Sequence, residues 1–90
     1  MAKIRVPTSL RSFTRNQAEV TAGGATVGEV LHHLEKSFPG LGPRLLDDKG
    51  AVRRYVNVFL NDEDIRFLEE LETPVKSSDR ITLIPAIAGG

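Results

Sequence analysis

Residues 26–38 read TVGEVLHHLEKSF and decide the fold of this chain of 90 residues. Thr26 followed by Glu29 is the capping-box pattern, in which side chains satisfy free N–H groups at the start of a helix. An apolar stripe then recurs at helical spacing, formed by Val27, Val30, Leu31, Leu34 and Phe38. Pro39 and Gly40 end the pattern. The segment therefore predicts one amphipathic helix with a single face available to cover a sheet.

Two strands are predicted before this helix. Residues 3–8 alternate charged and apolar side chains, as a half-buried strand does, and residues 18–22 repeat the alternation. Between them, residues 15–17, Arg-Asn-Gln, have the composition of a turn. These segments predict a loose hairpin.

Beyond the helix the pattern becomes strand-like again. The expected elements are a short helical turn at 41–46, a strand at 52–60, an acidic turn at 61–64, a fourth strand at 65–68 and a last strand at 80–84. Pro85 has no N–H for a ladder, so regular pairing is expected to fail there.

This order of elements predicts an α+β domain in two layers. A crossover helix between a hairpin and a later parallel strand gives a mixed sheet of four to five strands packed on one main helix. That arrangement is the β-grasp, or ubiquitin-like, fold. We expect residues 1–85 to form the domain and residues 86–90 to form an extended, flexible C-terminal tail.

The composition of the chain excludes several classes of function. Twelve basic and twelve acidic residues give a net charge of zero, which disfavours nucleic acid or an anionic membrane as the main partner. The chain has no cysteine, which excludes a disulfide framework and thiolate metal sites. Because no stretch approaches the roughly 18 apolar residues of a membrane span, we expect a soluble cytoplasmic protein.

Several motifs favour ordinary structural interpretations. Residues 23–28 lack the lysine and the glycine spacing of phosphate-binding loops, so a turn and helix cap are expected there. His32 and His33 are adjacent on the helix and point in different directions, so they are expected to lie on the surface without sharing a metal. Residues 62–64 are expected to form a solvated acidic turn. With no catalytic constellation present, we expect no enzyme, no bound cofactor and no metal.

The C-terminus carries the functional hypothesis. Gly89 and Gly90 place an α-carboxylate after two residues without Cβ atoms. Residues 86–90 can reach about 17 Å when extended, at roughly 3.3 Å each, which is far enough to enter another protein's active site. The Gly90 carboxylate is therefore the candidate reactive group, and Ala88 and Gly89 are expected to contact a partner.

The sequence also resembles a known family over nearly its full length. The residues that carry the resemblance are Pro7-Thr8, Leu10-Arg11, Thr26, Gly28, Leu34-Glu35, Pro39-Gly40, Arg44-Leu45, Asp47, Val56-Asn57, the segment from Asn61 to Phe67, Pro85-Ala86 and Ala88-Gly89-Gly90. They resemble the ubiquitin-like sulfur carriers of the ThiS, MoaD and CysO type, and the CysO-like branch in particular.

That resemblance implies a chemistry and a set of partners. An adenylating enzyme of the MoeB/ThiF type would use ATP to activate Gly90, and sulfur would then give a thiocarboxylate. In the CysO-like branch, a cysteine-synthase-type enzyme accepts the sulfur and a JAB/Mov34-type metalloprotease releases cysteine.

Docking is expected on the sheet face away from the helix. Phe59 and Ile84 project there if Val58 and Leu83 face inward, and Arg53 or Arg54 would add a polar rim. The alternation equally allows Ile84 to belong to the core. The alternatives are a MoaD-like carrier for molybdopterin synthesis, a carrier for thiamine, tRNA thiolation or protein tagging, and a plain β-grasp interaction module.

Overall fold

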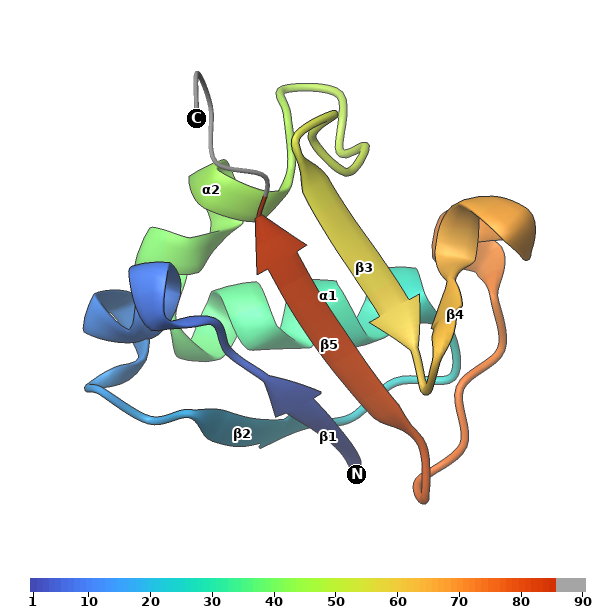
Figure 1. The fold of residues 1–90 in the computed structure, drawn as a ribbon, viewed down its shortest axis with the longest axis horizontal. Helices are drawn as coiled ribbons and strands as arrows, with labels where there is room; N and C mark the ends of the chain where they lie inside the picture. Colours follow the sequence, from blue (N-terminus) through green and yellow to red (C-terminus); the bar gives the residue numbers. More distant parts are fainter. Residues whose placement is uncertain (86–90) are drawn as a thin grey trace.

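In the computed structural model, residues 1–85 are described, and they form a five-stranded sheet with α1 across one face (Figure 1). The strands are β1 (Ala2–Arg5), β2 (Glu19–Ala22), β3 (Val56–Leu60), β4 (Glu63–Asp64) and β5 (Arg80–Pro85). The helices are α1 (Val27–Ser37) and α2 (Gly42–Leu45), with 3-10 segments η1 (Thr8–Thr14), η2 (Pro39–Leu41), η3 (Ile65–Phe67) and η4 (Glu70–Glu72).

The strand order β2-β1-β5-β3-β4 confirms the predicted β-grasp topology. β1 pairs antiparallel with β2 and parallel with β5, so the mixed sheet closes through the crossover that contains α1. β3 pairs antiparallel with β5, along the edge of β5 that faces away from β1. The first and last strands of the chain therefore lie side by side at the centre of the sheet (Figure 1).

The core lies between the sheet and α1. Ile4, Val58, Ile81 and Leu83 from the strands are buried with the predicted helix stripe, of which Val27, Val30, Leu31 and Leu34 are fully covered. The predicted cap is also present, since Thr26 Oγ1 accepts a hydrogen bond from Glu29 N at 3.2 Å. Glu29 Oε1 accepts in return from Ala25 N at 3.2 Å, one residue before the usual position.

The hairpin is looser than a simple turn would make it, because η1 lies between its strands. Leu10 and Thr14 of η1 are buried, so this segment extends the core rather than only reversing the chain. The expected turn follows at Arg15 and Asn16, whose φ angles of 56° and 64° lie in the left-handed region.

The strand predicted for 52–60 begins later, at Val56. Arg53 N donates to Leu45 O, and Val52 forms an isolated bridge with Leu46, so this stretch pairs with the end of α2 instead of the sheet. The prediction of a strand at 65–68 is wrong. Asp64 accepts a hydrogen bond from Arg66 N and starts the turn η3, which leaves only Glu63–Asp64 as β4.

Pairing continues through Pro85, contrary to the prediction that it would fail there. Val56 is the register partner of Pro85 across β3 and β5. On the other side of β5, the pairing with β1 ends at Thr82. The end of β5 therefore has one sheet neighbour, and a proline is tolerated where the second side of a strand is open.

Candidate functional site

The predicted reactive end of the chain lies outside the described residues. Gly90, Gly89 and Ala88 all fall in the segment 86–90, so the division into a domain and a tail stays a prediction. The last described residue is Pro85, which ends β5 at the side of the molecule where α2 lies (Figure 1).

The face of the sheet turned away from α1, called the outer face below, carries both predicted docking residues. Val58 and Leu83 are buried in the core, and the pleat therefore turns their neighbours Phe59 and Ile84 outward. Ile84 is 45% exposed and Phe59 is half-buried. Ile84 thus does not belong to the core, which settles the alternative that the sequence left open.

Phe59 and Ile84 are close enough to act together. Phe59 lies opposite Thr82 and Asn57 lies opposite Ile84, so Phe59 and Ile84 are diagonal neighbours across β3 and β5. Diagonal pairs on one face of an antiparallel ladder lie within reach of large side chains. The two side chains therefore form one apolar patch near the end of β5.

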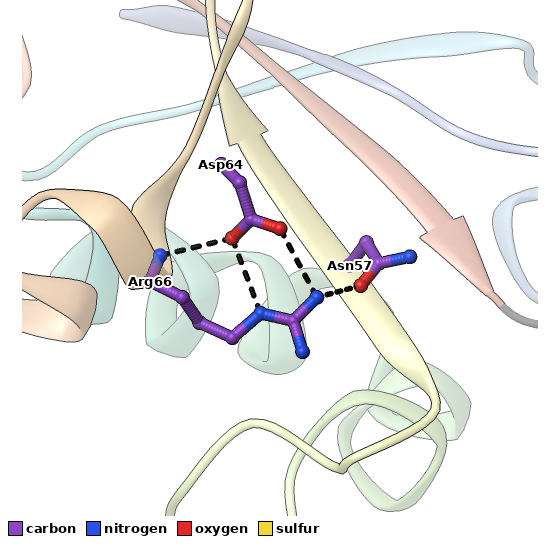
Figure 2. A network of polar contacts seen from close by, with 3 residues as sticks. All are labelled: Asn57, Asp64 and Arg66. Carbon is purple, nitrogen blue, oxygen red and sulfur yellow. Dashed lines mark hydrogen bonds and ion pairs between the residues drawn. The ribbon is translucent and has the colours of Figure 1, made fainter.

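A polar network borders this patch, formed by Asn57, Asp64 and Arg66 (Figure 2). Arg66 Nε donates to Asp64 Oδ1 at 3.3 Å, and Arg66 Nη2 donates to Asp64 Oδ2 at 3.0 Å. Arg66 Nη2 also donates to Asn57 Oδ1. The backbone N of Arg66 donates to Asp64 Oδ1 at 2.9 Å, which fixes the start of η3 as well.

The same contacts set the charge states in the network. Hydrogen bonds from the Arg66 side chain and backbone hold the pKa of Asp64 below its ordinary value. The hydrogen bond to Asp64 and its negative charge raise the pKa of Arg66 in turn. Near neutral pH the pair is therefore fully ionised and the two charges offset one another.

The other half of the outer face carries three basic side chains, next to acidic ones. Lys3 of β1 lies directly opposite Arg80 of β5, and both are exposed. Arg5 lies two residues further along β1, opposite Thr82 on one side and Glu19 on the other. The outer face thus combines an apolar patch, an ion-paired polar border and an end of mixed charge.

The arginines predicted as a polar rim, Arg53 and Arg54, lie near the Asp64–Arg66 pair. Arg53 Nε donates to Pro43 O at 2.6 Å. Together with Arg54, Asp64 and Arg66, it lines a pocket of about 370 Å³ that also contains Val56 and Val58, whose side chains face the core. The polar residue directly opposite Ile84 is Asn57.

The two histidines differ in environment. His33 Nδ1 accepts a hydrogen bond from Gly23 N at 2.7 Å and joins α1 to the end of β2, so it is not the simple surface residue expected. His32 is exposed, and its Nδ1 lies 4.0 Å from Glu35 Oε2.

Among residues 1–85 no cluster of three or more histidine, aspartate or glutamate side chains is arranged to hold a metal ion. Nor is any helix in that range long and apolar enough to cross a membrane.

Sequence reasoning missed Arg66 as a site residue. The available signal was the Asp64-x-Arg66 spacing, because an aspartate that caps a turn is placed to pair with a basic residue two positions later. Nothing in the spacing connects either residue to Asn57. That contact depends on how η3 packs against β3.

Comparisons with known proteins agree with this fold. The model of the ThiS family matches residues 4–90. The sulfur carrier protein CysO of Mycobacterium tuberculosis is 42% identical over 89 residues, which is 97% of this chain and 96% of that protein. Small archaeal modifier protein 3 of Haloferax volcanii is 39% identical over 66 residues, which cover 73% of this chain and 71% of that protein.

Superposition on a solved structure agrees with the family match. A chain in the crystal structure of the Amycolatopsis orientalis BexX/CysO complex superimposes with a TM-score of 0.93, at 40% identity and with full coverage of both chains. The family match, the relatives and the superposition confirm the resemblance seen in the sequence. The chain belongs to the ThiS family of ubiquitin-like sulfur carriers, as a non-catalytic small carrier of the CysO-like kind.

Proposed function

We propose that this chain carries sulfur as a thiocarboxylate on Gly90 and delivers it for cysteine biosynthesis. The observation that carries the proposal is the 42% identity to CysO over nearly the whole chain. The match to the ThiS family also extends to residue 90, so the terminal Gly89 and Gly90 lie within the matched region.

The chemistry begins with a poor electrophile. A free carboxylate is a resonance-stabilised anion, and its oxygen is a poor leaving group. A MoeB/ThiF-type enzyme would join the Gly90 carboxylate to the AMP part of ATP, with release of pyrophosphate. A sulfur nucleophile then displaces AMP to leave the thiocarboxylate. The chain itself binds no cofactor in this scheme, because the partner enzyme uses the ATP.

The body and the end of the chain have separate tasks. Phe59 and Ile84 dock on the activating enzyme, since an exposed apolar patch on a small domain is typical of an interaction surface. Ala88 and Gly89 then enter the active site, where glycine fits a narrow passage that a side chain would block. A relative is found in the BexX/CysO complex, which supports docking as the way such carriers work.

Delivery would use a cysteine-synthase-type enzyme. The thiocarboxylate sulfur attacks an activated serine derivative, its leaving group departs, and a thioester joins Gly90 to the new cysteine. An acyl shift from sulfur to nitrogen turns this thioester into an amide. A JAB/Mov34-type metalloprotease hydrolyses the amide, which releases cysteine and restores the Gly90 carboxylate.

Attachment of Gly90 to other proteins is a second candidate, because the chain also resembles a small archaeal modifier protein. Sulfur transfer to molybdopterin, thiamine or tRNA is a variant of the same carrier role. A plain β-grasp interaction module is the remaining alternative, in which Gly90 does not react.

The decisive experiment supplies the thiocarboxylated chain to each type of acceptor. With a cysteine-synthase-type enzyme and an activated serine, the intact mass should become that of the unloaded chain plus one cysteine residue, and the metalloprotease should return it to the mass of the unloaded chain. Transfer to a molybdopterin precursor or to protein lysines, with no cysteine adduct, would contradict delivery for cysteine biosynthesis.

A further inference from the structure

The pocket of about 370 Å³ beside β3, called the β3 pocket below, lies between the stretch before that strand and the turns η3 and η4. Its apolar lining residues are Ala51, Val52, Val56, Val58, Ile65 and Leu71. Pockets that hold small molecules have volumes of roughly 300–1,000 Å³, so the β3 pocket has room for one large apolar side chain.

An exposed aromatic side chain stands next to this pocket. Phe67 of η3 is 86% exposed, and Leu68 after it is 37% exposed. Both lie in the chain between Arg66 and Glu69, which line the pocket. The turn that carries Phe67 is fixed, because Asp64 Oδ1 accepts a hydrogen bond from Arg66 N at 2.9 Å. The surface therefore presents an apolar projection and an apolar pocket side by side.

Some of the charges around the pocket are offset within the chain. The charged lining residues are Arg53, Arg54, Arg66, Asp64, Glu69, Glu70 and Glu72. Arg66 forms an ion pair with Asp64, and the charge of Glu70 acts on it as well. Arg53 lies near enough to Asp47 for the two charges to attract one another. These four lining residues therefore already have opposite charges beside them.

The other three charged lining residues are available to another molecule. Arg54, Glu69 and Glu72 are exposed, and none of them forms an ion pair with a residue in the range 1–85. Arg54 belongs to the segment that enters the start of β3, whereas Glu69 and Glu72 belong to the segment that follows β4 (Figure 1). Phe67 lies on the same segment as the two glutamates. One wall of the pocket thus carries the apolar projection and negative charge, and the other carries positive charge.

A surface of this kind is complementary to a second copy of itself. In a two-fold dimer the same patch is used by both copies, turned by half a rotation, so each feature meets a different feature of the partner. That rotation brings Phe67 and the acidic wall of one copy to the pocket and the basic wall of the other. Because the net charge of the chain is zero, two copies have no overall repulsion to overcome.

We propose that this surface is the interface of a weak two-fold dimer, in which Phe67 of each copy inserts into the β3 pocket of the other. Arg54 of one copy then faces Glu69 and Glu72 of its partner, which adds attraction between the two walls. The inference goes beyond the proposed function and does not rest on it, because the docking patch on the outer face takes no part in the dimer.

Self-association of the full chain is measured by sedimentation between roughly 10 µM and 1 mM, the range in which small interfaces dissociate. The average mass should rise toward that of a dimer. Phe67→Ser should raise the dissociation constant about 10-fold or more, because each dimer loses two buried aromatic side chains. Its melting temperature should match that of the parent at low concentration, since Phe67 is exposed in the monomer. Ile84→Ala is the matched control, because it removes an exposed apolar side chain from the outer face, and it should dissociate as the parent does.

A charge exchange tests how the two walls face one another. Arg54→Glu, or Glu69→Arg together with Glu72→Arg, should weaken self-association, because like charges then meet. A mixture of the two variants should form mixed dimers, seen by native mass spectrometry, because opposite charges meet again at both contacts. Arg15→Glu is the control in the mixture, since it has the same net charge as Arg54→Glu and Arg15 lies in the turn after η1, outside the pocket. It should form about 10-fold fewer mixed dimers with the Glu69→Arg, Glu72→Arg variant, because at one of the two contacts arginines still face one another.

Sedimentation of the parent as a monomer over the whole range would overturn the proposal. Dimers that survive Phe67→Ser would overturn it too. If Ile84→Ala disrupts the dimer instead, the copies meet through the outer face and the assignment of the β3 pocket fails. Mixed dimers that form equally well with Arg54→Glu and with Arg15→Glu would contradict the facing of Arg54 with Glu69 and Glu72.

Discussion

Leu83 and Ile84 are neighbours in β5, yet their side chains face opposite sides of the sheet. Leu83 is 1% exposed and packs in the core, whereas Ile84 is 45% exposed on the outer face. The pleat of one strand thus separates a residue that holds the fold from one that is available to a partner. Substitutions at these two positions should therefore have opposite consequences.

Leu83→Ala should lower the free energy of unfolding by about 2–5 kcal/mol, because it leaves a cavity in the core. Ile84→Ala should change that free energy by less than about 1 kcal/mol, but it should raise KM for loading by the activating enzyme. Urea unfolding and loading kinetics of both variants measure the two effects. Equal destabilisation by the two variants would contradict the assignment of faces.

Glu70 is expected to be a strained position. Its φ of 51° is left-handed, a conformation that glycine adopts without the steric cost of a Cβ atom. Glu70→Gly should raise the free energy of unfolding by roughly 0.5–1 kcal/mol, even though glycine makes the unfolded chain more flexible. Glu69 is the matched control in the same turn, because its φ of −110° suits any residue.

Glu69→Gly should therefore lower stability by roughly 0.5–1 kcal/mol, through the added freedom of the unfolded chain. Both variants are compared with the parent by urea unfolding. The same sign of change in the two variants would argue against strain at Glu70.

Acid should destabilise the fold through three aspartates. Asp47 accepts hydrogen bonds from Ala51 N and Lys49 N, Asp79 accepts one from Lys76 N, and Asp64 pairs with Arg66, so all three have lowered pKa values. Lowered folded-state pKa values stabilise the fold above the ordinary carboxyl pKa of about 4. That contribution should be lost as the pH falls below about 4 and passes through the lowered pKa values that the three aspartates have in the folded state.

The pH dependence can be assigned with Asp47→Asn, which keeps an oxygen acceptor but does not titrate. Urea unfolding from neutral pH to about pH 3 should show a smaller acid-induced loss for this variant than for the parent. Two curves of identical shape would show that Asp47 does not contribute.

The features that could be predicted from the sequence are those set by local periodicity. The helix stripe around Leu31 and Leu34, the Thr26 cap and the hairpin strands each depend on residues within a few positions of one another, so their order was enough to give the β-grasp topology. Alternation allowed Ile84 to face outward or to belong to the core, and the structure decides between the two because Val58 and Leu83 are buried.

The features that could not be predicted depend on contacts distant in sequence. Residues 52–55 look like a strand, but they pair with the end of α2, which no local pattern encodes. Residues 65–68 have strand composition, but the Asp64 cap turns them into η3. The Asn57–Arg66 contact exists only because that turn forms beside β3.

The glycine end should be needed for loading and not for folding. Deleting Gly89 and Gly90, or adding a bulky residue after Gly90, should abolish loading, because the reactive carboxylate is removed or cannot enter the active site. Thermal unfolding should be nearly unchanged, since chain ends contribute little to packing. A large loss of stability would instead assign these residues a structural role.

The most direct test of the account is the intact mass of the chain after incubation with ATP, a sulfur donor and a MoeB/ThiF-type enzyme that loads a control carrier. The mass should rise by the difference between one sulfur and one oxygen, located on Gly90 by fragmentation and reversed by hydrolysis. An unchanged mass beside a loaded control, or sulfur found at any other residue, would contradict it.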